Sequence, residues 1–429
     1  MSPFWRLLRN NSNYRLTWIG QVVSEIGDHF NSIAVLSLTL HLTGSGLAVG
    51  AVMIARVLPA IVAGPAAGVH LDRLDRRLIM IISDLVRFVI ALCFILILTH
   101  HQSWLLYLLS GLLTFASPFF TAGRSAILPK IVSTEELHTA NALTQTTAWL
   151  TLSIGTMLGG ISTMQFGYET AFVINAGSFL FSAVMIWMLR GSFLPARSRI
   201  HPTFRIFARD FFDSVQYMRR EPIVMAIALA GVGWASGGGA AQVLFTMFGE
   251  VVYKRGPAGI GLIWGSAGVG LVVGGLLGHR LGERFSYARY KTAVAVCFLI
   301  HGVAYILFSQ MPTLWGSILF IAISRVAMGM NNVLNRTMLL KHVPDALRGR
   351  VFTAVDTMLN VTMILSLSAA GVASEFLTIR TVGAIAGALS ASTTIFWFWA
   401  NVAGKLPEPQ TNTPEESSEM EESNSVTPA

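Results

Sequence analysis

Four of the ionisable residues inside long apolar stretches of the sequence are candidates for function: Glu25, Asp28, Arg56 and Arg325. A charged side chain at the centre of a bilayer costs about 2.5–3.5 kcal/mol on insertion scales, so its presence there calls for a reason. Carboxylate and guanidinium groups inside a membrane can carry a proton, pair with each other or bind a charged solute. We therefore take these four residues as candidates for proton coupling or for a substrate cavity.

Asp28 and Arg56 should lie at similar depths in a membrane. At a rise of about 1.5 Å per residue, Asp28 lies about 12 Å below the outer edge of a hydrocarbon core about 30 Å thick, and Arg56 about 15 Å below it. Glu25 shares the helical face of Asp28. Our hypothesis is that Asp28, with Glu25, takes up and releases a coupling proton while Arg56 tunes its affinity. The alternative is a fixed ion pair that joins two helices.

Arg325 is the other cation expected near mid-membrane, about 18 Å along its segment by the same rise. A substrate with carboxylate or catecholate groups would be a natural partner, and pairing with a neighbouring helix is the alternative. Asp84 and Arg87 are spaced i,i+3 and should satisfy each other's charge. We expect His301, a lone histidine in an apolar segment, to be hydrogen-bonded without a further role.

The elements that position these residues must be membrane helices. Of the 429 residues, 53% are hydrophobic and only 12% are charged, against about 25% charged in soluble domains. Cys93 and Cys297 both fall in apolar runs, so we expect no disulfide framework. The composition predicts an all-α integral membrane protein.

Twelve segments are long and apolar enough to span a bilayer, which takes about 20 residues. We place them at 16–41, 46–70, 78–99, 103–123, 140–164, 168–189, 222–249, 258–279, 290–310, 313–336, 351–374 and 379–402. Alternating the crossings puts most of the 30 lysines and arginines on one side, with only Lys254, Arg255 and Arg380 in the opposite loops. By the positive-inside rule the basic side is cytoplasmic, and both termini lie there.

The segments divide the chain into four parts. We expect a six-helix bundle at 1–190, a cytoplasmic linker with an amphipathic helix at 191–221, a second six-helix bundle at 222–403 and a disordered acidic tail at 404–429. The tail is rich in Pro, Ser, Thr and Glu, a composition typical of disorder. Basic and aromatic residues alternate in the linker, which suits the membrane interface.

Several function classes are excluded or unsupported. No G-x-x-x-x-G-K-[ST] phosphate loop occurs, which excludes ATP-driven transport within this chain, and no H-E-x-x-H pattern supports a zinc protease. We expect neither an enzyme nor a metal site. The net charge of +8 follows membrane topology, so no nucleic-acid partner is expected.

The loop after the second segment carries the most specific motif. It reads G-x-x-x-D-R-x-x-R-R, with Gly68, Asp72, Arg73, Arg76 and Arg77 at the fixed positions. This loop resembles the one between the second and third helices of the major facilitator superfamily, and the resemblance covers nearly the whole chain.

The resemblance implies two pseudo-symmetric six-helix bundles with a substrate route between them. The same spacing separates Gly68 from Gly278 and Leu137 from Leu347, as expected for an internal repeat. We expect Asp72 to meet the N-terminal end of the eleventh helix when the cytoplasmic gate closes, and Arg73 or Arg76 to meet Asp356.

Glycines mark further elements. Gly155, Gly159 and Gly160 form a motif similar to the fifth-helix element of drug and proton antiporters, with Thr156 in place of the usual proline. Small residues at this spacing let helices approach closely, and Gly64 and Gly68 repeat it. The run 237–239 should either bend its helix or allow tight packing.

Four short stretches look like those of bacterial exporters of the enterobactin and macrolide-efflux type: 24–28, 56–59, 83–87 and 344–350. This resemblance implies a secondary active transporter of the bacterial inner membrane that exports a small amphiphilic molecule by alternating access, driven by a proton gradient with no cofactor. We expect a monomer in the lipid bilayer, with the small molecule as its partner. A lysophospholipid flippase, a nutrient uptake permease or a non-transporting sensor remain alternatives.

Overall fold

The computed structural model describes residues 3–100, 102–194 and 204–408, and long helices make up most of this part of the chain. The last part of the predicted tail, 409–429, lies outside the described residues, as does 195–203 of the predicted linker. The helices of the first half are α1 (Pro3–Asn10), α2 (Ser12–Thr43), α3 (Gly46–Leu71), α4 (Arg76–Cys93), α5 (Ile95–His100), α6 (Trp104–Ile131) and α7 (Leu137–Trp187).

The second half follows a connecting helix, α8 (Phe204–Arg220). Its elements are α9 (Pro222–Gly238), α10 (Ala240–Met247), the π-helix η1 (Phe248–Val252), α11 (Gly256–Gly282), α12 (Tyr287–Gln310), α13 (Leu314–His342), α14 (Asp345–Phe376) and α15 (Ile379–Val402). The glycine run 237–239 separates α9 from α10. Gly239 keeps right-handed helical angles, and a Cβ there would lie 2.2 Å from the Met363 carbonyl oxygen, so the run serves tight packing.

Ten helical stretches among the described residues meet the length and hydropathy expected of a membrane span. Two features make this number smaller than the twelve predicted segments. The 51-residue α7 contains two predicted segments and breaks at Gly167, where φ is 83°. Helix α2 covers the segment 16–41, but its polar residues, Glu25 and Asp28 among them, lower its mean hydropathy. All twelve predicted segments fall on helix.

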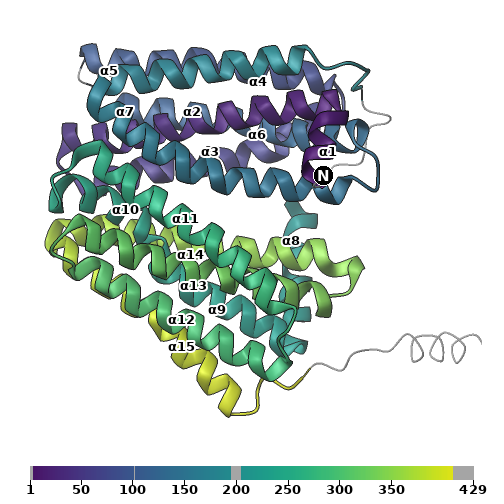
Figure 1. The fold of residues 1–429 in the computed structure, drawn as a ribbon, viewed down its shortest axis with the longest axis vertical. Helices are drawn as coiled ribbons and strands as arrows, with labels where there is room; N and C mark the ends of the chain where they lie inside the picture. The colour runs from purple at the N-terminus through teal and green to yellow at the C-terminus, as the bar shows by residue number, and fades with distance from the viewer. Residues whose placement is uncertain (1–2, 101, 195–203, 409–429) are drawn as a thin grey trace, which may run out of the picture.

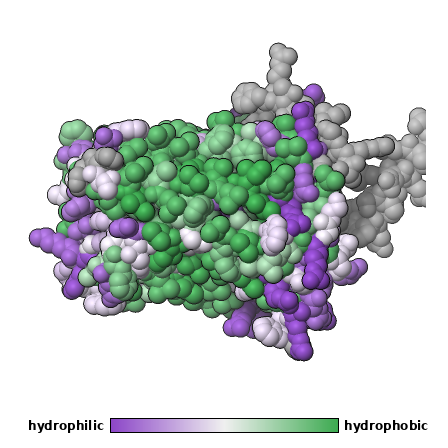
Figure 2. All heavy atoms as spheres, turned by 90° about the horizontal axis from the view of Figure 1, so that it is seen from above, coloured by the Kyte–Doolittle hydropathy of each residue, from purple (hydrophilic) through white to green (hydrophobic). Residues whose placement is uncertain are grey.

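The helices form two bundles (Figure 1), with α2–α7 in the first and α9–α15 in the second. Between the bundles, α7 packs on α11 and α3 packs on α14. The side chains that face outward form a broad hydrophobic band between two polar ends (Figure 2). Such a band is the surface expected of a protein that spans a bilayer.

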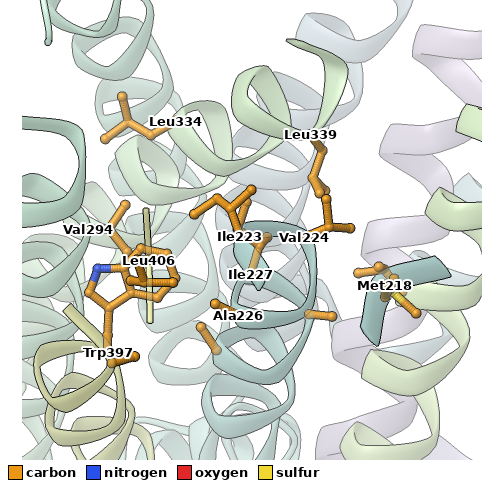
Figure 3. Packing of buried hydrophobic residues seen from close by; sticks show 14 of the residues in the cluster. Met218, Ile223, Val224, Ala226, Ile227, Val294, Leu334, Leu339, Trp397 and Leu406 are labelled. Carbon is orange, nitrogen blue, oxygen red and sulfur yellow. The ribbon is translucent and has the colours of Figure 1, made fainter. Parts of the chain in front are cut away.

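A cluster of buried residues holds one end of the second bundle together and includes the connecting helix. The cluster includes Met218 of α8, Ile223 and Val224 of α9, Trp397 of α15 and, beyond the last helix, Leu406 (Figure 3). The Trp397 indole N–H donates a 2.9 Å hydrogen bond to the Lys291 carbonyl oxygen. Because Met218 is part of this cluster, α8 packs on the second bundle.

Candidate functional site

The two bundles are pressed together at the end that the charge pattern predicts to be outer. The Ser45 hydroxyl, at the start of α3, donates a 2.7 Å hydrogen bond to the Glu375 carboxylate near the end of α14. Close by, a Cβ on Gly50 would lie 3.7 Å from the Gly371 Cα. The second and eleventh predicted segments therefore meet directly at this end.

The antiporter-like glycines belong to the same closed end. A Cβ on Gly160 of α7 would lie 2.4 Å from the Pro257 carbonyl oxygen of α11, so only glycine permits this approach between the bundles. Gly155 and Gly159 instead face His29 and Phe30 of α2, within the first bundle. The motif thus joins three helices at one place.

A third contact across the closed end was missed by sequence reasoning. The Ser37 hydroxyl of α2 donates a 2.9 Å hydrogen bond to the Glu250 carboxylate in η1, and Ser37 also lies 3.2 Å from the Tyr168 hydroxyl. Glu250 and Glu375 stand near the ends of predicted spans, where a carboxylate reads as an ordinary solvated charge. The structure gives each of them a role at the closed end, because Glu250 accepts a hydrogen bond from Ser37 and Glu375 accepts one from Ser45.

The opposite end of the bundles is not packed in this way. A Cβ on Gly64, Gly68 or Gly349 would have no atom within 4 Å. The expectation that Gly64 and Gly68 pack closely against another helix is therefore wrong for this conformation. The reason is that they lie at the end where the two bundles diverge (Figure 1), so the structure is an outer-closed, inner-open form.

Two arginines of the predicted inner gate donate hydrogen bonds within the first bundle. The Arg76 guanidinium donates a 2.8 Å hydrogen bond to the Ala126 carbonyl oxygen, and Arg77 donates to the Trp187 carbonyl oxygen. Asp72 caps the end of α3, and its backbone N–H bonds to the Gly68 carbonyl oxygen. Arg73 and Asp356 are exposed. The expected contact of Arg73 or Arg76 with Asp356 stays a prediction for the inner-closed form.

Glu25 is the centre of a polar network between α2, α6 and α7. Its carboxylate accepts a 2.7 Å hydrogen bond from the Gln21 amide and a 2.8 Å hydrogen bond from the Thr151 hydroxyl. The Arg124 guanidinium lies 3.8 Å away. Arg124 directly follows the predicted segment 103–123, and nothing in the sequence connects it to Glu25.

A small polar cavity of about 40 Å³ adjoins this network. Gln21 and Arg124 line it, together with Tyr14 and Asn141. Tyr14 and Asn141 belong to the cytoplasmic ends of α2 and α7 in the predicted topology. The cavity therefore extends from Gln21 and Arg124, which contact Glu25, toward the open cytoplasmic end.

Asp28 and Arg56 lie near one another but do not form a direct ion pair in the described structure. The Arg56 guanidinium instead donates a 2.8 Å hydrogen bond to the Ser32 hydroxyl, one helical turn beyond Asp28 on α2. Arg56 and Arg87 are both close enough to act on Asp28 electrostatically. A fixed Asp28–Arg56 lock is thus not formed in this conformation.

The pairing of Asp84 with Arg87 is confirmed. The two side chains form an ion pair that is 0% and 3% exposed, and the guanidinium also lies 4.8 Å and 4.4 Å from the ring centres of Phe120 and Phe179. The expected hydrogen bonding of His301 is confirmed as well, since its Nδ1 lies 2.7 Å from the Ser324 hydroxyl.

Arg325 borders a cavity of about 180 Å³ between the bundles. The side chain is 7% exposed, and its guanidinium carbon lies 5.4 Å from the centre of the Phe245 ring. Among the described residues no carboxylate pairs with it, so the alternative of an acidic helix neighbour is not met. The cavity walls come from α9, α10, α11, α13 and α14, and Leu152 of α7 adds the first bundle's side.

A larger hollow of about 780 Å³ lies elsewhere, between α12 and α13. Its lining is almost wholly apolar and includes outward-facing residues such as Ile300, Leu319 and Ile323. None of the four ionisable candidates lines it. The cavity beside Arg325 is therefore the better candidate for a solute.

Known proteins share both this architecture and this sequence pattern. The family model described as Major Facilitator Superfamily matches residues 17–366 and, separately, 253–427. The chain is 27% identical to the uncharacterized MFS-type transporter YfiS of Bacillus subtilis, covering 89% of this chain and 92% of that protein. It is 24% identical to the putative bacilysin exporter BacE of Bacillus subtilis, covering 82% and 86%, and 24% identical to the enterobactin exporter EntS of Citrobacter koseri, covering 83% of each.

Solved structures agree on the fold. The crystal structure of the nucleoside transporter NupG superposes with a TM-score of 0.71 at 12% identity, covering 92% of this chain and all of that one. The predicted resemblance to the enterobactin exporter type is confirmed by the relatives. The chain belongs to the major facilitator superfamily of membrane transporters.

Proposed function

We propose that this protein is a secondary active exporter of a small amphiphilic molecule, coupled to protons through Asp28 and Glu25. It would act in the bacterial inner membrane as a monomer, with both termini in the cytoplasm and no cofactor. The observation that carries the proposal is the position of the two carboxylates. They lie on α2, which also forms a contact of the closed outer end, and Thr151, the partner of Glu25, adjoins Leu152 in the wall of the cavity between the bundles.

The outer contacts are of a kind that can break and form again. Hydroxyl groups of Ser37 and Ser45 donate hydrogen bonds to carboxylates of the other bundle. The other contacts are close approaches at glycines and the packing of apolar side chains such as Leu40 and Met247. Rocking of the two bundles about the central site would open this end and close the other. Exposing Asp28 and Glu25 to each side in turn would let them exchange protons with both solutions.

Proton coupling at these carboxylates has a physical basis. Burial favours a neutral acid, whereas a nearby cation or hydrogen-bond donor favours the ionised form. Glu25 has Arg124 and Thr151 beside it in this conformation, and Asp28 has Arg56 and Arg87 within electrostatic reach. Moving the helices would change the balance between the neutral and ionised forms of each carboxyl group, and so would change whether it carries a proton.

The direction of transport is supported by the relatives, whose names include exporters of bacilysin and enterobactin. The test uses inside-out membrane vesicles whose lumen is acidified by a proton pump. A proton-driven exporter accumulates fluorescent amphiphiles in such vesicles, and nigericin, which collapses the pH gradient, abolishes the accumulation.

Asp28→Asn should reduce this accumulation to the level seen with nigericin but leave exchange of substrate without a gradient intact. The matched control is Glu283→Gln, an exposed acid on the inner side. Full gradient-driven accumulation by Asp28→Asn would show that the proton role is wrong. Accumulation only in right-side-out vesicles would indicate an uptake permease, and movement of lysophospholipid alone would indicate a flippase.

A further inference from the structure

The guanidinium of Arg325 is a nearly buried cation without an ionic partner in the described structure. Its side chain is 7% exposed, and its guanidinium lies beside the Phe245 ring and within electrostatic reach of His301 and Tyr305. A buried charge is costly unless a counter-charge or several hydrogen bonds compensate for it. The cavity beside Arg325 is the place from which a compensating group could come.

The walls of that cavity supply hydrogen-bond donors and aromatic surface but no acid. Trp234 and Trp264 line it, and the indole N–H of each is buried without a hydrogen-bond partner. The Gln242 and Asn332 amides also line it. No Asp or Glu is among the described lining residues. The polar groups available are therefore suited to a solute that accepts hydrogen bonds and carries negative charge.

The apolar part of the lining fits a flat ring. Trp264 packs edge-on to Phe245, with ring centres 5.1 Å apart and an angle of 79° between the planes. Met328 and Met363 complete the wall. Aromatic faces and methionine side chains bind planar apolar groups well and adapt to their shape.

We propose that this cavity is an anion-selective substrate site, in which Arg325 binds a carboxylate or similar monoanionic group and Trp234, Phe245 and Trp264 hold its aromatic or apolar body. This inference rests on the proposed function and specifies its substrate class. The two bundles then have different functions. The first carries the acidic residues Glu25 and Asp28, and the second forms most of the cationic substrate site.

Three probes with one ring system test the site: 1-naphthoate, 1-naphthylmethanol and 1-naphthylmethylamine. Their binding to the purified full-length protein in nanodiscs can be measured by calorimetry. We expect 1-naphthoate to bind at least about tenfold more tightly than the alcohol, because hydrogen bonds between ionised groups are the strong ones. The amine should bind most weakly.

Variants distinguish the effect of the Arg325 charge on binding from a general loss of the folded structure. Arg325→Gln should remove the preference for 1-naphthoate while leaving binding of the alcohol unchanged, and Arg325→Lys should retain part of the preference. Trp264→Phe keeps a ring but removes the N–H, and should weaken 1-naphthoate more than the alcohol. Arg280→Gln, exposed on α11, and Trp315→Phe, 71% exposed on α13, are the matched controls and should change neither probe.

Equal binding of the three probes, or a preference for 1-naphthoate that survives Arg325→Gln, would overturn the inference. Transport in the inside-out vesicles distinguishes the two proposals. If the alcohol is exported under a gradient but 1-naphthoate is neither preferred nor dependent on Arg325, the exporter stands and the anion site fails. If 1-naphthoate binds through Arg325 but no probe moves, the site stands and the exporter fails.

Discussion

Arg124 on α6 lies 3.8 Å from the carboxylate of Glu25 on α2, and the two side chains are 19% and 26% exposed. Thr151 of α7 donates to the other carboxylate oxygen, so three helices of the first bundle meet at one acidic group. This contact gives Glu25 a setting that differs from that of Asp28, although the two residues share a helical face.

Glu25 and Arg124 should act as one unit in transport. We expect Glu25→Gln and Arg124→Gln each to slow gradient-driven accumulation, and the double variant to be no slower than Glu25→Gln alone, since residues in one network have non-additive effects. Initial rates in inside-out vesicles measure this. Losses that simply add would mean that the two residues act independently, and Glu283→Gln serves again as the unaffected control.

Gly160→Ala should prevent the outer end from closing fully. The added methyl group would lie 2.4 Å from the Pro257 carbonyl oxygen, and overpacking of this kind costs about 1–3 kcal/mol. That cost would lower the population of the outer-closed form by roughly 5- to 150-fold and reduce transport accordingly.

Gly177→Ala is the control for this substitution, because a Cβ on Gly177, also in α7, would have no neighbour within 4 Å. Transport by Gly177→Ala should match that of the unmodified protein. Normal transport by Gly160→Ala would contradict the assignment of Gly160 to a moving contact.

A disulfide at the closed end should stop the transport cycle. In a background with Cys93 and Cys297 replaced by alanine, Gly50→Cys with Gly371→Cys places two thiols where a Cβ already comes within 3.7 Å of the opposite Cα. A Cβ this close to the opposite Cα places the two Cα atoms within reach of a disulfide, whose Cα atoms lie up to about 6.8 Å apart.

Oxidation should abolish transport by this double-cysteine protein, and dithiothreitol should restore it. The matched pair at the open end, Gly68→Cys with Gly349→Cys, should not cross-link in the same conformation, because neither glycine has a neighbour there. Unchanged transport after complete cross-linking at the closed end would rule out rocking as the transport motion.

The buried pair of Asp84 and Arg87 should matter more for stability than any exposed pair. Asp84→Asn leaves the charge of Arg87 uncompensated, at a cost of about 3–5 kcal/mol. Asp84→Leu with Arg87→Met should cost less than Asp84→Asn alone, because no charge remains buried. Thermal unfolding of the purified protein measures both.

Asp213→Asn is the matched control for that measurement. Its pair with Arg209 is 54% and 83% exposed, so its loss should change stability by no more than about 1 kcal/mol. If Asp84→Asn also lowered the stability by no more than about 1 kcal/mol, the buried pair would have no structural role.

The sequence by itself determined the helices and the family. Runs of about 20 apolar residues can only be satisfied in a bilayer as helices, because every backbone polar group must bond within its own segment. The pairing of Asp84 with Arg87 was equally predictable, since i,i+3 neighbours meet on any helix surface. The loop motif at Gly68 and Asp72 identified the superfamily before any contact was known.

The tertiary structure alone decided which distant side chains meet and which end is closed. Glu25 meets Arg124, and Arg56 bonds to Ser32 instead of to Asp28, because each helix is rotated about its own axis to fit its neighbours. Such rotations depend on packing summed over many residues, so a single sequence does not reveal them. Another arrangement of the two bundles would keep the same helices, and the contacts at Gly160, Glu250 and Glu375 show that this one is closed outside.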